Sequence, residues 1–158
     1  MKNTSLNLFF SCLLLPVFFS CDRKLPEKKT SGSHSNEIVA ISVSHVGGHL
    51  GHYNIVRVTK DSVKAEKGMS ANQTHQEWGA PISGDTWKKL TASIQIKDLD
   101  FIKSSPSRQP VDGIDETFQI RTPKKSHIYV NSYVDTVHYR QFQQLKEQLN
   151  TILPKEYR

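Results

Sequence analysis

Residues 38–59 read IVAISVSHVGGHLGHYNIVRVT, two apolar, strand-like stretches separated by a glycine-rich connection. In the first stretch Val39, Ile41 and Val43 alternate with small polar or small residues, which is the period-two pattern of a half-buried strand. The second stretch, residues 53–59, is rich in β-branched side chains and is also typical of a strand. The glycines between them permit positive φ and interrupt regular structure. The whole segment therefore predicts a β-hairpin.

Three more strands are predicted after this hairpin, over residues 62–66, 117–122 and 127–133. Each is short and carries apolar residues at every second position. In the last of them, Ile128 and Val130 are expected to face the core.

Two polar segments are predicted to be loops. Residues 68–81 contain a single aromatic residue, Trp78, which is expected to hold the loop against the domain. Residues 104–115 contain two prolines, which remove backbone donors and fix φ. Near the end of this segment stands Asp112-Gly113, a strong turn pair.

A first helix is predicted to begin after Ser83, a favourable N-cap, with Asp85 adding negative charge to the first turn. Ile82 and Trp87 occupy the two positions of a hydrophobic staple. The apolar face continues at Leu90 and Ile94, and the segment after the helix is expected to send three more residues to the core: Leu99, Phe101 and Ile102.

A second helix is predicted from Thr136 to Leu153, capped by Asp135 and stopped by Pro154. Its apolar stripe consists of Phe142, Leu145, Leu149 and Ile152. The predicted order is β-β-β-α-β-β-α. The simplest packing is an antiparallel sheet of about five strands with two helices on one face, an α+β fold whose strand order the sequence leaves open.

The N-terminal segment predicts export and lipid attachment. Lys2 precedes an apolar run from Leu6 to Phe19, which is shorter than the roughly 20 residues needed to span a bilayer and is typical of a secretory signal. Ser20-Cys21 resembles the site cut by lipoprotein signal peptidase, which implies that the thiol of Cys21 carries a diacylglycerol. Residues 1–20 are therefore expected to be a signal peptide, and the alternative is ordinary cleavage near Ser20 with release of the protein.

Residues 21–36 are predicted to be the lipidated cysteine and a flexible tether, because this polar stretch offers little to bury. Residues 37–158 then form one globular domain. The chain has two cysteines, and Cys12 lies in the segment expected to be cleaved. The domain therefore has no cysteine for a disulfide, and a thiol nucleophile is excluded.

The net charge of +6 falls to +5 on cleavage, because Lys2 is the only charged side chain removed. Within the domain the basic residues are dispersed, whereas nucleic-acid binders tend to concentrate them on one face. Nucleic acid is therefore not an expected partner. Solubility and weak attraction to anionic headgroups near the anchor are the expected uses of the charge. The predicted location is the cell envelope, with Cys21 attached to membrane lipid.

Short motifs spread over residues 37–158 carry a resemblance to a known group of proteins. They are Asp61-Ser62-Val63, Trp87-Lys88-Lys89-Leu90 with Ile94, Ser105-Pro106-Ser107 leading to Asp112-Gly113, and Leu153-Pro154-Lys155-Glu156-Tyr157-Arg158. In these motifs the domain resembles small Bacteroidetes lipoproteins of unknown function. The resemblance implies a fold family and a location, and no activity.

A second resemblance is carried by Gly47-Gly48 and Gly51 after the first strand, the helix near Ser83, and Phe101. Together with two late strands and a closing helix, these features are similar to emfourin-type inhibitors of thermolysin-like proteases. That likeness implies a protruding, rigid glycine loop at residues 45–53.

The candidate binding residues crowd the connection of the first hairpin: His45, Gly47, Gly48, His49, Leu50, Gly51 and His52. This connection is longer than the about two residues that chain reversal requires, and loops held on rigid strands often carry binding residues. We expect a contact surface with His49 and Leu50 at its tip, in a non-enzymatic binding module for a protein or envelope component. The alternatives are protease inhibition and a metal site made by the three histidines of this loop.

The sequence offers little for catalysis. Asp112, Asp115 and Glu116 are candidate carboxylates for acid–base work or for calcium, but Asp112-Gly113 is explained as a turn. A calcium loop needs more oxygen ligands at regular spacing. Motifs for a serine nucleophile or a phosphate-binding glycine loop are absent. We therefore expect no enzymatic activity and no cofactor.

Overall fold

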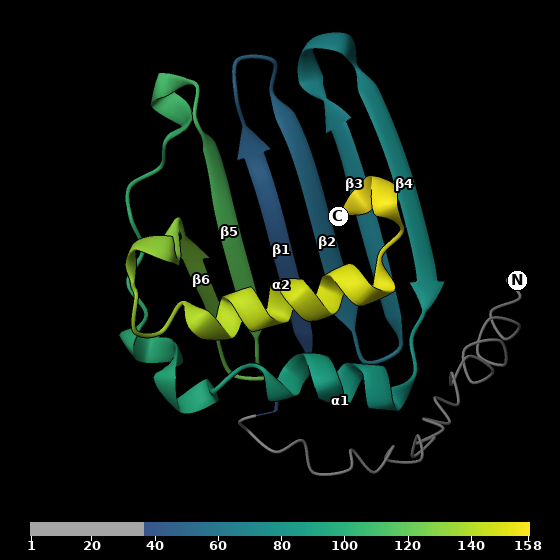
Figure 1. The fold of residues 1–158 in the computed structure, drawn as a ribbon, viewed down its shortest axis with the longest axis vertical. Helices are drawn as coiled ribbons and strands as arrows, with labels where there is room; N and C mark the ends of the chain where they lie inside the picture. Colours follow the sequence, from purple (N-terminus) through teal and green to yellow (C-terminus); the bar gives the residue numbers. More distant parts are fainter. Residues whose placement is uncertain (1–36) are drawn as a thin grey trace, which may run out of the picture. The chain divides into compact units, whose positions relative to one another are not determined.

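The computed structural model describes residues 37–158, which form a six-stranded antiparallel sheet with two α-helices on one face (Figure 1). The α+β class is confirmed, with one strand more than predicted. The main elements are β1 (Ala40–Gly47), β2 (His52–Thr59), β3 (Ser62–Met69), β4 (Thr74–Pro81), α1 (Gly84–Ala92), β5 (Ile114–Arg121), β6 (Ser126–Val130) and α2 (Arg140–Ile152). Short 3-10 turns are η1 (Ser70–Asn72), η2 (Ile96–Phe101), η3 (Gln109–Val111), η4 (Ser132–Val134) and η5 (Lys155–Tyr157).

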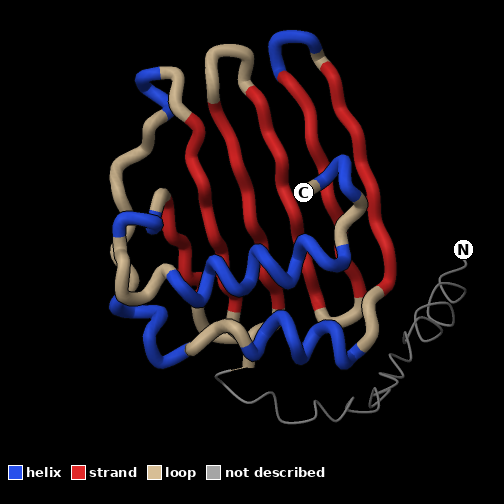
Figure 2. The backbone as a smooth tube through the Cα atoms, viewed as in Figure 1, coloured by secondary structure: helices blue, strands red, loops and turns tan. Residues whose placement is uncertain are grey.

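The strands lie in the order β4-β3-β2-β1-β5-β6, and all neighbours are antiparallel (Figure 2). The predicted hairpin, β1 and β2, is therefore in the middle of the sheet. Ile41 lies opposite Val58 in β2 and Ile120 in β5, which gives one continuous apolar row. Ile41 and Val43 are buried as predicted, whereas Val39 precedes β1 and is exposed.

β4 is the strand that the sequence prediction missed, since residues 68–81 were expected to be a loop. It pairs with β3 from Ser62 opposite Pro81 to Met69 opposite Thr74. β4 is an edge strand with the polar sequence THQEWGAP, and only Trp78 and Ala80 are partly buried against the core. Such a strand lacks the apolar alternation by which strands are recognised.

The last two strands also differ from the prediction. β5 begins at Ile114 and not at Thr117, so the predicted loop over residues 104–115 ends earlier than expected. In β6 the core face carries His127 and Tyr129, whereas Ile128 is 56% exposed. Pairing places Tyr129 opposite the fully buried Phe118, and a strand exposes alternate residues on opposite faces. The prediction that Ile128 and Val130 face inward is therefore wrong.

The first helix follows the sequence closely. Ser83 caps it, because its Oγ accepts a hydrogen bond from the Thr86 N–H at 3.1 Å, and Trp87 and Leu90 are buried. In η2 the predicted core residue Phe101 is 66% exposed. A 3-10 helix has three residues per turn, so the buried residues Leu99 and Ile102 share one side and Phe101 does not.

The second helix begins at Arg140, later than the predicted Thr136. Asp135 caps the preceding turn and not the helix itself, because its carboxylate accepts hydrogen bonds from the N–H groups of Val137 and His138. Burial alone would raise the pKa of Asp135, but the hydrogen bonds from His138, Lys103 and Val137 lower it to about 2. Of the predicted stripe, three residues are buried and Ile152 packs against the core with part of its surface exposed.

The core lies between the helices and one face of the sheet. Phe118 of β5 stacks on Phe142 of α2 with ring centroids 4.2 Å apart, and both are fully buried. Figure 1 shows that α1 and α2 cross the strands towards one end. The other end, which carries the β1–β2 and β3–β4 connections, extends beyond them, and we call it the distal end. No helix within residues 37–158 has both the length and the apolar character to cross a membrane.

Candidate functional site

The glycine-rich connection between β1 and β2 lies at the distal end and is fixed from both sides. Gly47, Gly48 and Gly51 all have positive φ, which favours glycine. On one side the Gly48 N–H donates to the Gly113 carbonyl at 3.0 Å. On the other side the carbonyls of Gly51 and Leu50 accept hydrogen bonds from η1, at 3.0 and 3.1 Å. The loop is thus a positioned part of the sheet.

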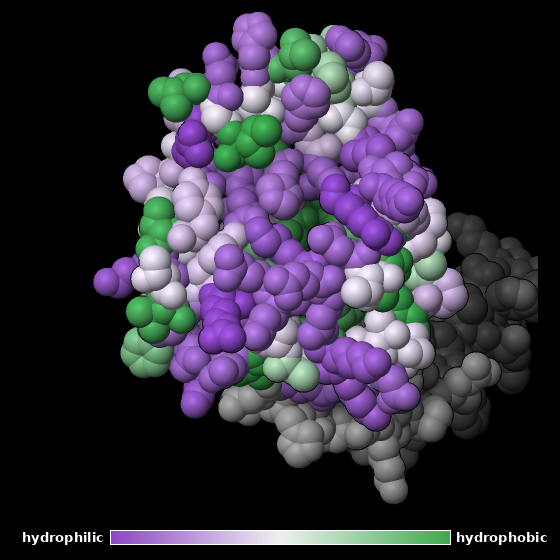
Figure 3. Space-filling model, viewed as in Figure 1, coloured by the Kyte–Doolittle hydropathy of each residue, from purple (hydrophilic) through white to green (hydrophobic). Residues whose placement is uncertain are grey.

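Exposed apolar side chains surround this loop. Leu50, Val111 and Ile114 are 42%, 79% and 49% exposed, and together we call them the distal rim. Gly47 pairs with Ile114. Val111 is the last residue of η3, and only Asp112 separates it from Gly113. Figure 3 shows hydrophobic groups gathered among polar ones at this end of the molecule. The rim therefore exposes an apolar surface on a fixed backbone.

A row of polar side chains crosses the helix-bearing face of the sheet just beyond the core. Strand register places the members side by side on five strands, in the order Gln76, Lys67, Asn54, His45 and Glu116. They lie two residues along each strand from inward-facing neighbours such as Val43, Val56 and Phe118. This polar row marks where the core ends.

Two adjoining hollows lie above the polar row, and we call them together the distal groove. The first, of about 430 Å³, lies between α2 and the sheet and has walls that include Val56, Leu149 and Leu153. The second, of about 670 Å³, extends towards β4 and includes His52, Met69 and Gln76. His45 and Asn54 border both hollows.

One end of the groove is closed by the C-terminal residues. The Lys67 ammonium donates to the Glu156 carbonyl at 2.6 Å and lies 5.0 Å from the centre of the Tyr157 ring. Tyr157 is buried, with its ring centroid 6.3 Å from that of Trp78. The C-terminal turn is therefore held on β3 and β4.

Glu116 is the centre of a hydrogen-bonded network at the other end of the row. Its side chain is only 9% exposed. It accepts hydrogen bonds from the Tyr139 hydroxyl and the Lys146 ammonium, both at 2.5 Å. The His45 Nε2 lies 3.2 Å from the same carboxylate.

This network holds two opposite charges in place. Burial alone would raise the pKa of Glu116, but hydrogen bonds from His45, Lys146 and Tyr139 lower it to about 2. Burial alone would lower the pKa of Lys146, but the bond to Glu116 raises it. A general acid or base needs a pKa near the working pH. Here the pKa of Glu116 is lowered and that of Lys146 is raised, so both pKa values move further from neutral pH. The arrangement is suited to a permanent ion pair.

Asn54 borders the groove and has a buried acceptor without a hydrogen-bond partner. Among residues 37–158, three buried side-chain oxygens have no hydrogen-bond partner within the protein: Asn54 Oδ1, Ser132 Oγ and Gln148 Oε1. Of these three residues, Asn54 is the one that borders the hollows. A buried acceptor without a partner is costly, so the polar row is not fully satisfied at Asn54.

The histidines of the glycine loop separate in the structure. His45 contacts Glu116, and His52 borders the second hollow together with His45. His49 is exposed and its Nδ1 lies 3.9 Å from the Asp112 carboxylate. The structure therefore brings two of the three candidate metal ligands to one hollow and places the third outside it.

The three candidate carboxylates, Asp112, Asp115 and Glu116, also lie apart from one another. Asp112 occupies a left-handed turn position. Asp115 accepts hydrogen bonds from Ser107, Asn131 and the Arg108 N–H. Glu116, the next residue of β5, lies on the opposite face of the sheet, where it contacts Lys146 of α2. These residues do not form a joint acid–base or calcium site.

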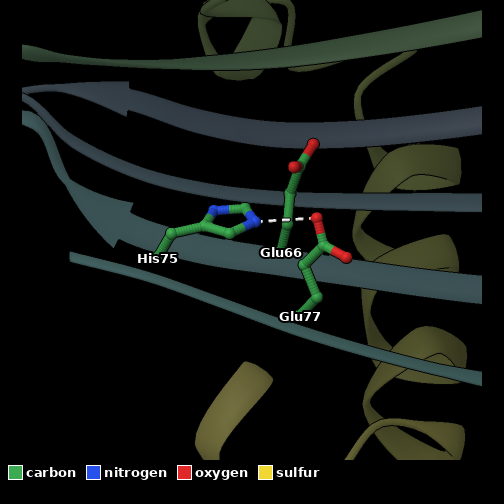
Figure 4. A group of neighbouring side chains, drawn as sticks. All are labelled: Glu66, His75 and Glu77. Carbon is green, nitrogen blue, oxygen red and sulfur yellow. Dashed lines mark hydrogen bonds and ion pairs between the residues drawn. The ribbon is translucent and has the colours of Figure 1, made fainter. Parts of the chain in front are cut away.

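A different group of potential ligands lies on the opposite face of the sheet and was missed. Donor atoms of Glu66, His75 and Glu77 all come within 4.8 Å of one another (Figure 4). Within residues 37–158 this is the one group of three or more such donors at that spacing. The sequence does contain one signal for this group, because His75 and Glu77 are two residues apart, as residues on one face of a strand are. The signal was not recognised because residues 68–81 were predicted to be a loop.

Cys21 lies outside the described residues, so lipid attachment stays a prediction. The two family resemblances also stay predictions, since neither a scan of protein-family models nor a search of curated proteins finds a match for this chain.

Proposed function

We propose that the protein is a lipid-anchored lipoprotein of the cell envelope whose domain binds a polypeptide partner without catalysing a reaction. The observation that carries the proposal is the distal groove with its apolar rim, built on a backbone fixed by hydrogen bonds from both sides. Loops held on rigid scaffolds are where binding residues concentrate.

The groove has the dimensions and chemistry of a binding site. Ligand pockets usually enclose about 300–1,000 Å³ and combine apolar walls with a few polar groups. Here the walls include Leu149 and Leu153, and His45 and Asn54 are polar residues at their border. A partner segment placed in the groove could bury an apolar side chain against these walls.

The distal rim extends this surface beyond the groove. Leu50 and Ile114 are large, exposed and close to the fixed glycine loop. Interfaces commonly have apolar anchors surrounded by polar residues. His49 and His52 supply polar neighbours for these apolar anchors. This combination is consistent with the contact surface predicted at residues 45–53.

Photo-crosslinking in cells tests the site of binding. A photoreactive amino acid at position 50 is expected to give a discrete adduct, whereas one at position 128 is not. Ile128 is a matched control because it is 56% exposed and lies on β6, away from the distal end. The adduct should disappear when Ile114→Asp is added. Equal adducts from both positions, or no adduct from position 50, would contradict the proposal.

The inhibitor alternative uses the same fixed loop and makes a separate prediction. The purified protein would inhibit a thermolysin-like protease, and Leu50→Asp would abolish the inhibition. That result would replace envelope binding by protease inhibition as the function of the loop.

Mass spectrometry of the mature N-terminus tests the anchor, and a Cys21→Ser variant should leave the membrane fraction.

A further inference from the structure

The face of the sheet opposite the helices carries a compact group of nitrogen and oxygen donors. Glu66 of β3 and Glu77 of β4 are directly opposite one another, and His75 lies two residues before Glu77 on the same face. The His75 Nε2 is 2.7 Å from a Glu77 carboxylate oxygen. Figure 4 shows both side chains meeting beside Glu66. Two strands therefore supply three donors to one point.

The charges of this group are only partly compensated by neighbouring side chains. Like charges directly opposite on neighbouring strands are destabilising, and Glu66 and Glu77 stand in that relation. Arg57 forms an ion pair with one oxygen of Glu66. Glu77 has only the imidazole of His75 as its ion-pair partner within residues 37–158. A cation between His75 and the carboxylates would complete the compensation.

A supporting residue on β2 orients the imidazole. Tyr53, Gly68 and His75 are opposite one another on β2, β3 and β4. The Tyr53 hydroxyl crosses over Gly68 and reaches the His75 Nδ1 at 2.7 Å. A Cβ at position 68 would lie 2.3 Å from that hydroxyl. The glycine therefore makes the contact possible, and the contact directs Nε2 towards the two glutamates.

We propose that Glu66, His75 and Glu77 bind one zinc ion. The ligands would be the Nε2 of His75 and one carboxylate oxygen from each glutamate. Imidazole with carboxylates suits zinc, and three protein ligands leave a fourth position for water or a partner's group. Calcium would need six to eight oxygen ligands, which three side chains of this kind do not provide.

The hydrogen bonds on the Nδ1 side of His75 can adjust to a metal at Nε2. Zinc at Nε2 displaces the proton there, so the neutral imidazole carries its proton on Nδ1 and donates it to the Tyr53 hydroxyl. That hydroxyl then donates to the Thr74 carbonyl, which lies 3.2 Å away. Tyr53 thus has a partner in both states, as groups that orient metal-bound histidines generally need.

Calorimetric titration of the untagged, metal-free full chain in detergent with zinc alone tests the proposal. We expect one zinc per chain, and at least a tenfold loss of affinity in His75→Gln and in Glu77→Gln. Removing an orienting partner typically costs about 10–100-fold in metal affinity, so Tyr53→Phe should weaken binding within that range. Circular dichroism of each variant checks that the sheet is intact.

The matched controls are His49→Gln and His52→Gln, which remove exposed imidazoles outside the cluster. Their zinc affinity should equal that of the wild type. The proposal would be overturned by the absence of saturable binding, or by binding that survives His75→Gln. Loss of binding in the two controls would also overturn it, and would assign the metal to the glycine loop. The visible spectrum of bound cobalt should likewise disappear in His75→Gln.

Discussion

The Lys146 ammonium on α2 lies 2.5 Å from the Glu116 carboxylate on β5 and joins helix to sheet where the core gives way to the groove. The two residues are 30 positions apart in the sequence. The stem of Lys146 also brings its ammonium 5.3 Å from the centre of the Tyr139 ring. The pair therefore joins β5 to the helix that forms one wall of the groove.

Lys146→Met should destabilise the domain, because it leaves Glu116 buried without its cation. Breaking a fully buried pair costs about 3–5 kcal/mol. We expect about 2–3 kcal/mol, since the Lys146 side chain is 32% exposed and Tyr139 still donates to Glu116. Urea unfolding measures the loss. The control is Lys88→Met, whose pair with Asp85 is exposed and should contribute less than about 0.5 kcal/mol.

Stability should fall in acid partly because of Glu116. Its ordinary pKa of 4.5 applies to the unfolded chain, and the folded value is about 2. The unfolded chain therefore binds the proton first as the pH falls, so the contribution is complete above about pH 4.5 and is lost towards pH 2. Asp135, with a folded pKa of about 2, acts in the same direction.

Unfolding free energies of the wild type and Glu116→Gln between pH 2 and 7 check this sign. The variant should show the shallower loss in acid, because glutamine does not titrate. Glu147→Gln, which changes an exposed residue of α2, should keep the wild-type slope. Parallel curves for the wild type and Glu116→Gln would show that the network does not couple stability to pH.

Gly47→Ala should disturb the distal end. Its φ of 135° disfavours any other residue, and an added Cβ would lie 2.2 Å from the Gly113 carbonyl oxygen. Such strained positions cost about 1–3 kcal/mol, and we expect a loss near the upper end by thermal unfolding. Gly84→Ala is the control, since nothing lies within 4 Å of its added Cβ. There a gain of about 0.4–1 kcal/mol is expected.

Trp87→Ala tests the packing of α1. Trp87 is 5% exposed and belongs to the core cluster. Truncating a large core side chain costs about 3–5 kcal/mol, which urea unfolding can measure. Val137→Ala, at a position 76% exposed, should change stability by less than about 0.5 kcal/mol. Similar losses for the two variants would place Trp87 outside the core.

The parts of the fold that could be predicted are those that local chemistry determines. The β1–β2 hairpin follows from alternating residues, and the start of α1 follows from the Ser83 cap. β4 could not be found, because an edge strand with polar residues on both faces lacks a hydrophobic period. In β6 the ring of Tyr129 is buried, although Ile128 is the more apolar residue.

The candidate sites depend on strand pairing and register, which cannot be read from local sequence patterns. The polar row exists only because register aligns His45 with Asn54 on one side and Glu116 on the other. The sequence pointed to the glycine loop as a whole, which the structure places beside the groove. It did not indicate that Glu66 faces Glu77, since that pairing required β4.

The central position of β1 has a consequence for the order of folding. β1 to β4 form an uninterrupted meander whose contacts are local, and local contacts form quickly. β5 must instead return to β1, where Glu116 meets a histidine 71 positions earlier in the chain. Until that closure occurs, β1 is an unprotected edge open to pairing with another chain. We therefore expect the slowest and most exposed step of folding to be also the one that completes the groove.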